Sequence, residues 1–243
     1  MSRKKSFRPR YLAIIFIICF GAVFGFTNND IKNVIQSVIS TRTILNTTDV
    51  GTIPEYSENP YVVINDNIPS FSEDDITTES FEQYSELDIL GRCGTAFANL
   101  SLDTMPTEER GNIGMIKPSG WQISKYDFID GKYLYNRCHL IGFQLSGENA
   151  NKQNLITGTR YLNVEGMLPF ENRVAEYIRK TGNHILYRVS PVFRDNNLLA
   201  DGVQIEALSV EDDGKGICFN VFCYNVQPGV EIDYKNGNNK KIK

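Results

Sequence analysis

Apolar and polar positions in the second half of the chain predict one amphipathic helix. Between Pro169 and Lys180 the apolar residues recur at i, i+4, i+7 and i+8, which is the spacing of one helical face. Gly182 follows where a residue with left-handed backbone commonly ends a helix. A helical segment capped by Thr159 and running through Asn163 precedes it, and Pro169 is expected to break or restart that helix.

Five further segments have the pattern of strands. Short polar turns separate the last three, so we predict that these three form an antiparallel meander. The order strand, strand, helix and three strands indicates an α+β fold, in which an antiparallel sheet carries helices on one face. The strand candidates are Leu87–Leu100, Tyr133–Leu140, His184–Phe193, Gly202–Val210 and Ile217–Val226.

The first 29 residues combine a basic start with an apolar run. Residues 1–26 hold five cations and no acid, and Tyr11–Phe26 is an apolar stretch of sixteen residues. This length is long for a signal-peptide core and short for a membrane span, and no Ala-x-Ala cleavage site follows. We expect a signal-anchor, or alternatively a signal peptide, over residues 1–29. The remainder is then extracellular, either membrane-anchored through this segment or secreted.

The formal net charge of the chain is −4, and the acidic residues are distributed unevenly after residue 26. Residues 27–87 carry eleven acids and two cations, whereas residues 88–243 carry eighteen of each. We expect an acidic, polar and largely disordered tether over residues 30–86, because its composition offers little apolar surface to bury. A folded domain over residues 87–236 and a basic tail over residues 237–243 complete the expected organisation. A neutral domain lacks the strong basic field of a nucleic-acid coat protein, but a local cation cluster can still bind phosphate.

Four cysteines follow the apolar run, and outside the cytoplasm they have three complete pairings open to them. Cys218 and Cys223 are five residues apart in one predicted strand, so their side chains should point to opposite faces and not pair. A bridge between Cys93 and Cys138 is one hypothesis. The sequence has no Cys-x-x-Cys motif or Cys/His cluster, which disfavours a zinc site.

One region concentrates residue types that can cut a phosphodiester. His139, one of only two histidines, lies beside Arg137 with one residue between them; Asn154 follows fifteen residues later and Asn163 nine after that. A neutral histidine can take a proton from water near pH 7. An asparagine amide oxygen can bind a hard metal ion, and a guanidinium can hold phosphate oxygens. The other histidine, His184, lies within a predicted sheet strand and is interpreted as structural.

Residues 88–235 resemble the DNA/RNA non-specific endonucleases, which are secreted nucleases of the ββα-metal type, and among them the streptococcal extracellular DNase branch. The stretches that carry this resemblance are Lys117–Gln122, Asn136–Leu140 and Asn154–Asn163. The family signature is Asp-Arg-Gly-His. Here Asn136 and Cys138 replace the aspartate and the glycine, whereas the arginine and the histidine remain. The resemblance implies a ββα-metal nuclease core.

The resemblance also implies a role for each matching residue. His139 would be the general base that activates water, and Arg137 would contact the phosphate. Asn163 would be the direct protein ligand of a Mg²⁺ ion, with Mn²⁺ as a substitute, and Asn154 would support the site by hydrogen bonding. Glu171, eight residues after Asn163, matches the family glutamate that orients metal-bound water.

One cation of the family pattern is missing. The family has an arginine four residues beyond its glutamate, and this chain has Ala175 there. Arg173 is the nearest candidate to bind nucleic acid in its place. Arg110 and Lys117, in a predicted loop, are two further candidates to contact the nucleic-acid backbone. Trp121 is expected in the core rather than as a platform for base stacking.

The sequence therefore predicts a Mg²⁺-dependent, sequence-non-specific endonuclease that hydrolyses DNA, with RNA left open as a second substrate. No protein partner is predicted. The alternative is an exported surface protein that binds nucleic acid without cutting it, which the substitutions at Asn136 and Cys138 motivate. A toxin domain neutralised by a partner is another alternative, for which the chain shows no immunity-binding signature.

Overall fold

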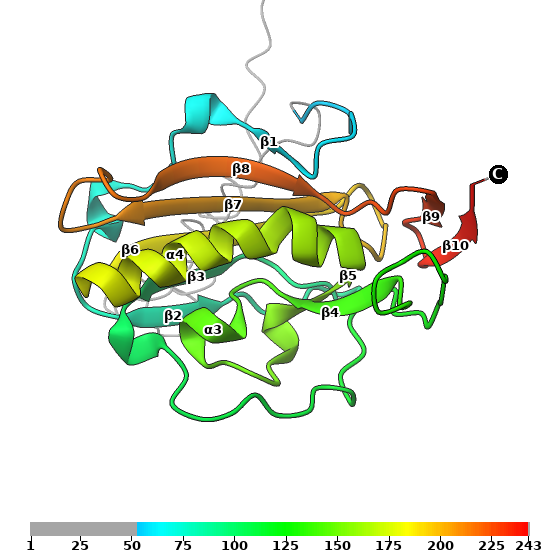
Figure 1. The fold of residues 1–243 in the computed structure, drawn as a ribbon, viewed down its shortest axis with the longest axis horizontal. Coiled ribbons are helices and arrows are strands. Elements are labelled where there is room, and N and C mark those ends of the chain that lie inside the picture. The colour runs from blue at the N-terminus through cyan, green and yellow to red at the C-terminus, as the bar shows by residue number, and fades with distance from the viewer. Residues whose placement is uncertain (1–52, 243) are drawn as a thin grey trace, which may run out of the picture. The chain divides into compact units, whose positions relative to one another are not determined.

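The computed structural model describes residues 53–242, and a six-stranded sheet lies at their centre (Figure 1). The strands lie in the order β1-β8-β7-β6-β3-β2, and all neighbouring pairs are antiparallel. This arrangement confirms the α+β fold class and the meander of the last three predicted strands. The bounds are β1 Tyr61–Val63, β2 Phe81–Tyr84, β3 Ala96–Leu100, β6 Ile185–Val192, β7 Gly202–Ser209 and β8 Cys218–Tyr224.

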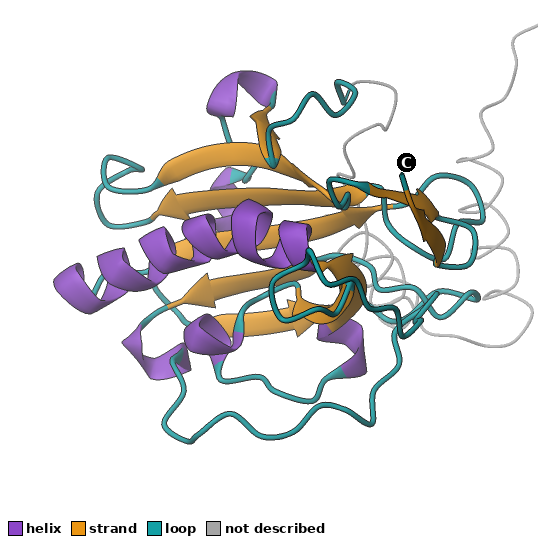
Figure 2. Cartoon of the chain, turned by 45° about the vertical axis from the view of Figure 1, so that its right-hand side comes forward, coloured by secondary structure: helices purple, strands orange, loops and turns teal. Residues whose placement is uncertain are grey.

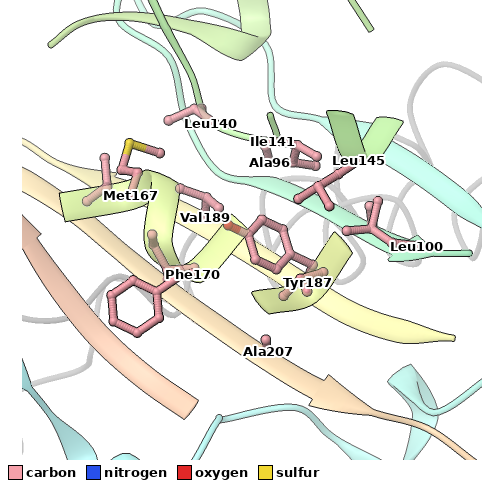
Figure 3. Close-up of a cluster of buried hydrophobic side chains, with 14 of the residues drawn as sticks. Ala96, Leu100, Leu140, Ile141, Leu145, Met167, Phe170, Tyr187, Val189 and Ala207 are labelled. Atoms are coloured by element: carbon pink, nitrogen blue, oxygen red, sulfur yellow. The ribbon is translucent and has the colours of Figure 1, made fainter. Parts of the chain in front are cut away.

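Helix α4, Leu168–Thr181, covers one face of this sheet (Figures 1 and 2). Its apolar stripe packs against side chains of β3, β6, β7 and β8, and Figure 3 shows Phe170 of the helix near Tyr187 of β6 in this core. Burial of each large apolar side chain contributes about 1.5–3 kcal/mol to the free energy of unfolding. The helix ends at Gly182, whose φ is +73° and whose amide donates to the Ile178 carbonyl, as the sequence predicted.

The helical region begins earlier than α4, and Pro169 does not interrupt it. Helical backbone starts at Arg160, passes through a π-helical turn over Leu162–Met167 and continues directly into α4. The proline is the second residue of α4 and follows the π-helical turn directly, which is where the hydrogen-bond pattern of the segment changes. The expected break was therefore wrong, and one continuous helical segment carries both Asn163 and Glu171.

Two further strands precede this segment and form a separate antiparallel ribbon. They are β4, Tyr135–His139, and β5, Leu155–Thr159, and Figure 1 shows them on the same side of the large sheet as α4. The order β4, β5, helix is the ββα arrangement. A short helix, α3 (Phe143–Ser146), lies between the two strands in sequence and contacts α4.

Residues 53–86 are ordered parts of the fold, so the expected tether does not describe them. Strand β1 pairs with β8 at one edge of the large sheet, and β2 pairs with β3 at the other edge. The large sheet therefore draws both its edge strands from this segment. Of the strand expected over Leu87–Leu100, only Ala96–Leu100 is extended in the sheet.

The same segment also covers the face of the sheet opposite α4. There Arg188 and Glu206 form a buried ion pair with an Nε–Oε2 distance of 2.8 Å. The Ser70 backbone amide donates to Glu206, and the Ser70 hydroxyl accepts from Arg188 while it donates to Glu206. Phe71 stacks on Phe97 with ring centroids 5.8 Å apart. A few well-placed side chains thus bury a segment whose average composition is polar.

Two smaller expectations also differ from the structure. Residues 238–241 form β10 (Asn238–Lys241), which pairs with β9 (Val230–Asp233), so they are not a free tail. All four cysteines after the apolar run are free, and the hypothesis of a bridge between Cys93 and Cys138 was wrong. The Cys93 thiol instead donates to the backbone carbonyls of Lys152 and Leu155, each at 3.2 Å.

The predicted signal segment over residues 1–29 and the first part of the expected tether lie outside the described residues. Within residues 53–242, no helix combines the length and the apolar character that crossing a membrane requires.

Candidate active site

A cleft of about 710 Å³ opens beside β4 and the helical segment. Both polar and apolar side chains line it, and they come from β4, α3, the π-helical turn and α4. The predicted site residues that line this cleft are Arg110, Arg137, His139, Asn163 and Glu171. Segments that are distant in sequence thus bring the predicted base and the predicted metal ligand to one cavity.

His139 ends β4 and is 6% exposed. Its Nε2 lies 2.8 Å from the carbonyl oxygen of Asn149. Because a carbonyl only accepts, Nε2 carries the hydrogen and Nδ1 keeps its lone pair. The Nη2 of Arg110 lies 3.4 Å from that Nδ1. Burial lowers the pKa of His139, the bond to Asn149 opposes this, and the charge of Arg110 lowers the pKa further, so the ring is neutral near pH 7.

Asn154 is fully buried behind the cleft and does not line it. Its Oδ1 accepts from the amide of Ile141 at 2.9 Å, and its Nδ2 donates to the carbonyl of the same residue at 3.0 Å. The Asn154 carbonyl accepts from the amide of Leu140 at 2.9 Å. These three bonds fix the backbone immediately after His139, so Asn154 acts on the position of that residue.

Asn163 lies in the π-helical turn, a feature that often occurs at functional sites. Its Nδ2 donates to the Oδ1 of Asn136 across 3.4 Å. This orientation leaves the Oδ1 of Asn163 as the atom that can bind a cation. Asn136, which stands where the family signature has aspartate, therefore orients the predicted ligand and adds no charge of its own beside it.

Glu171 lies in the first turn of α4 and reaches the backbone at Gly142. A Cβ atom at Gly142 would lie 2.7 Å from a carboxylate oxygen of Glu171, so only glycine leaves room for the carboxylate in this place. Burial raises the pKa of Glu171 to about 7, while Gln144 and the charge of Arg110 act in the opposite direction.

Replacement of Gly142 by alanine is expected to lower the predicted nuclease activity by about 10- to 100-fold, because a small misplacement of a site group has an effect of this size. The backbone of Gly142, with φ −59° and ψ 142°, suits alanine, so the melting temperature should change little. Steady-state kinetics of Gly142→Ala, alone and combined with Glu171→Gln, measure the effect. If the alanine lowers the rate equally in both backgrounds, it does not act through Glu171.

Arg137 is bound to the protein rather than free in the cleft. Its guanidinium lies 4.0 Å from the ring centroid of Trp121 and donates to the carbonyls of Gly114 and Ile116. Trp121 is half-buried and packs against the core cluster that contains Leu134 and Leu199, so its expected place in the core is confirmed in part. It also lines the cleft, where Arg137 stacks on its ring.

Comparison with known proteins decides the family. A family model described as DNA/RNA non-specific endonuclease matches residues 72–211. The chain belongs to the DNA/RNA non-specific endonuclease family. It is accordingly an enzyme that hydrolyses nucleic acid, and the matched residues contain β4, β5 and the whole helical segment.

Two solved structures have a similar fold. NucA from Streptococcus agalactiae, with a magnesium ion bound, has a TM-score of 0.68 and 23% sequence identity, over 79% of this chain and 93% of that chain. The Sda1 nuclease, with a bound zinc ion, has a TM-score of 0.63 and 25% identity, over 76% of this chain and 97% of that chain. These likenesses confirm the ββα-metal nuclease fold.

The other cations that line the cleft of this endonuclease differ from those that the sequence predicted. Lys117 and Arg173 do not line the cleft, and the Arg173 guanidinium lies 5.8 Å from the ring centroid of Phe219 on β8. Arg160, which the sequence reasoning missed, does line the cleft and pairs with Asp130. Its position three residues before Asn163, one helical turn away, is the sequence signal that could have revealed it.

Proposed function

We propose that this endonuclease cleaves DNA without sequence preference, that His139 is its general base and that Mg²⁺ is its cofactor. The observation that carries the proposal is the position of His139 and Asn163 on the walls of one cleft. RNA, which has the same phosphodiester linkage, is a second substrate to be compared directly with DNA.

The tautomer of His139 supports its role as base. The Nδ1 lone pair takes a proton from the attacking water as the water oxygen bonds to phosphorus and the phosphorus–sugar oxygen bond breaks. The imidazolium formed in this step keeps its Nε2–H bond to the Asn149 carbonyl, which stabilises the positive charge. Arg110, which lies 3.4 Å from Nδ1 in the free enzyme, is placed to move onto a phosphate oxygen when substrate enters.

The side chains present fit a hydrated Mg²⁺ ion. Within residues 53–242, no group of three or more His, Cys, Asp or Glu side chains could hold a metal, so a cage of protein ligands is not available. The Oδ1 of Asn163 and the carboxylate of Glu171 are oxygen donors, which suit Mg²⁺ with most of its waters retained better than they suit zinc. When bound, the ion would neutralise charge that develops on the phosphate.

An extracellular location belongs to the same proposal. The basic and apolar start of the sequence predicts export. Two further proteins with similar folds, at TM-scores of 0.54 and 0.50, are described as an extracellular endonuclease and an extracellular nuclease. Whether the N-terminal segment stays as a membrane anchor or is removed is tested by the mass of the mature protein.

The Arg110→Gln variant is expected to raise the pKa of His139, because a cation beside Nδ1 is removed. In the wild type, burial and Arg110 keep this pKa below the ordinary 6.5, so His139 should remain neutral and active down to lower pH than a free histidine. NMR titration of the imidazole resonances measures the pKa, with His184 as the internal second histidine. A His139 pKa at or above 6.5 in the wild type would overturn this account of its environment.

Plasmid nicking separates an enzyme from a protein that only binds nucleic acid. The purified protein should convert supercoiled plasmid to nicked and then linear DNA in Mg²⁺, and EDTA should stop the conversion. Binding without nicking under both conditions would favour the surface-binding alternative. Parallel reactions on single-stranded RNA of matched length determine whether both substrates are cut.

A further inference from the structure

We infer that Arg160 is a catalytic residue that contacts the scissile phosphate and stabilises its negative charge during cleavage. This inference rests on the proposed function, since it assigns a role within the same cleft.

The first observation is the position of Arg160. It is the first residue after β5, and its backbone amide donates to the carbonyl of Leu134 at 2.8 Å. Asn163 lies three residues later in the helical segment, so the two side chains share one helical face. Both line the cleft that also holds His139. The ββα connection therefore places this guanidinium next to the proposed metal ligand.

The second observation is an incomplete set of hydrogen bonds. The Nη2 of Arg160 lies 2.7 Å from Oδ2 of Asp130, and Nη1 lies 3.5 Å from Oδ1 of Asn136. The Nε atom is buried and has no hydrogen-bond partner among residues 53–242. A buried guanidinium donor without a partner is costly, so the present contacts do not fully satisfy this side chain, and a movement that brings its N–H groups onto a phosphate oxygen would be favoured.

The third observation is the weakness of the ion pair that holds Arg160. The side chain of Asp130 is 83% exposed, whereas that of Arg160 is 34% exposed. Because solvent screens such a pair, it contributes little to the stability of the fold. The guanidinium can therefore leave this carboxylate when a phosphate enters the cleft, and its place in the fold does not depend on Asp130.

The fourth observation concerns the other cations of the cleft, Arg110 and Arg137. Arg137 donates to two loop carbonyls and stacks on Trp121, and Arg110 lies against Nδ1 of His139. Arg160 is the cation of the cleft that is linked, through Asn136, to Asn163, and its buried Nε has no partner among residues 53–242. It is therefore placed to bind the phosphate on the side of the metal ligand.

Hydrolysis of a phosphodiester needs a positive charge beside the phosphate. As the water oxygen bonds to phosphorus and the sugar oxygen leaves, negative charge grows on the non-bridging oxygens and on the leaving oxygen. A guanidinium offers two parallel N–H donors that fit these oxygens, and a lysine offers only a point charge. The substitution Arg160→Lys should consequently be damaging even though it preserves the charge.

The test compares Arg160→Met, Arg160→Lys and Asp130→Asn with the wild-type protein in plasmid nicking. Arg160→Met should lower kcat by roughly 100-fold, the effect of removing one transition-state donor, and Arg160→Lys should recover only a small part. Asp130→Asn removes the ion pair but keeps the guanidinium, so its kcat should stay close to that of the wild type. Melting temperatures identify any variant whose loss comes from unfolding.

A second readout does not depend on catalysis. Binding of a short duplex in EDTA should become less dependent on salt in Arg160→Met, with the slope of log K against log salt reduced by about one. Equal losses of kcat in Asp130→Asn and Arg160→Met would overturn the inference, as would wild-type kcat in Arg160→Met. An unchanged salt slope would overturn the phosphate contact. A wild-type protein that fails to nick DNA would instead refute the proposed function.

Discussion

Replacement of His139 by alanine is expected to reduce kcat for plasmid nicking by about 10²–10⁴-fold, the usual contribution of a general base. The structure gives the reason, because His139 lines the cleft and its Nε2 is engaged with the Asn149 carbonyl, which leaves Nδ1 as the atom that can take a proton. DNA binding in EDTA should persist, since the cations of the cleft remain. Nicking rates, duplex binding and the circular dichroism spectrum measure the three properties.

The other histidine provides the matched control. His184 lies outside the cleft, and its Nδ1 is 2.6 Å from a carboxylate oxygen of Glu211. The substitution His184→Ala removes the same side chain from the protein and should leave kcat near the wild-type value. If His139→Ala retains more than roughly a tenth of the wild-type kcat, His139 is not the general base.

Replacement of Asn163 by alanine is expected to raise the Mg²⁺ concentration for half-maximal nicking by at least about tenfold, because it removes the proposed direct ligand of the ion. Asn163→Asp keeps an oxygen donor and adds a negative charge, so it should bind the ion at least as well as the wild type. Metal titrations of the nicking rate, and calorimetry with Mg²⁺ in the absence of DNA, measure the change.

An asparagine outside the cleft serves as the control for this variant. Asn183 donates to the hydroxyl of Tyr177 near the end of α4 and does not line the cleft. Asn183→Ala should give a wild-type metal titration. The same metal titration in Asn163→Ala would show that Asn163 does not bind the ion.

Much of the fold could be read from periodicity in the sequence. The apolar stripe of α4 and the glycine that ends it are local features, and the three strands of the meander are long enough to show their pattern. Strands β1 and β2 were missed because each has only three or four residues and lies at an edge. Their stability comes from pairing with strands distant in sequence, and composition averaged over a segment hides such contacts.

The candidate site, like the fold, could be predicted from the sequence only in part. Spacing and the family resemblance together pointed to His139 and Asn163, and the structure brings both to one cleft. Spacing could not show that Arg137 donates to loop carbonyls and stacks on Trp121, since these contacts depend on the path of the loop before β4. The sequence predicted the helix that starts after Thr159, but it could not show that Arg160 lines the cleft and pairs with Asp130, since both depend on how the loop before β4 folds.

The central claim is that His139 and Asn163 face one hydrated divalent cation, and crystals soaked in Mn²⁺ test it most directly through anomalous scattering. We expect one strong peak in the cleft, about 2.1–2.2 Å from the Oδ1 of Asn163, with His139 on the opposite wall. A peak bound elsewhere, or an occupied cleft in which Asn163 does not touch the ion, would contradict it.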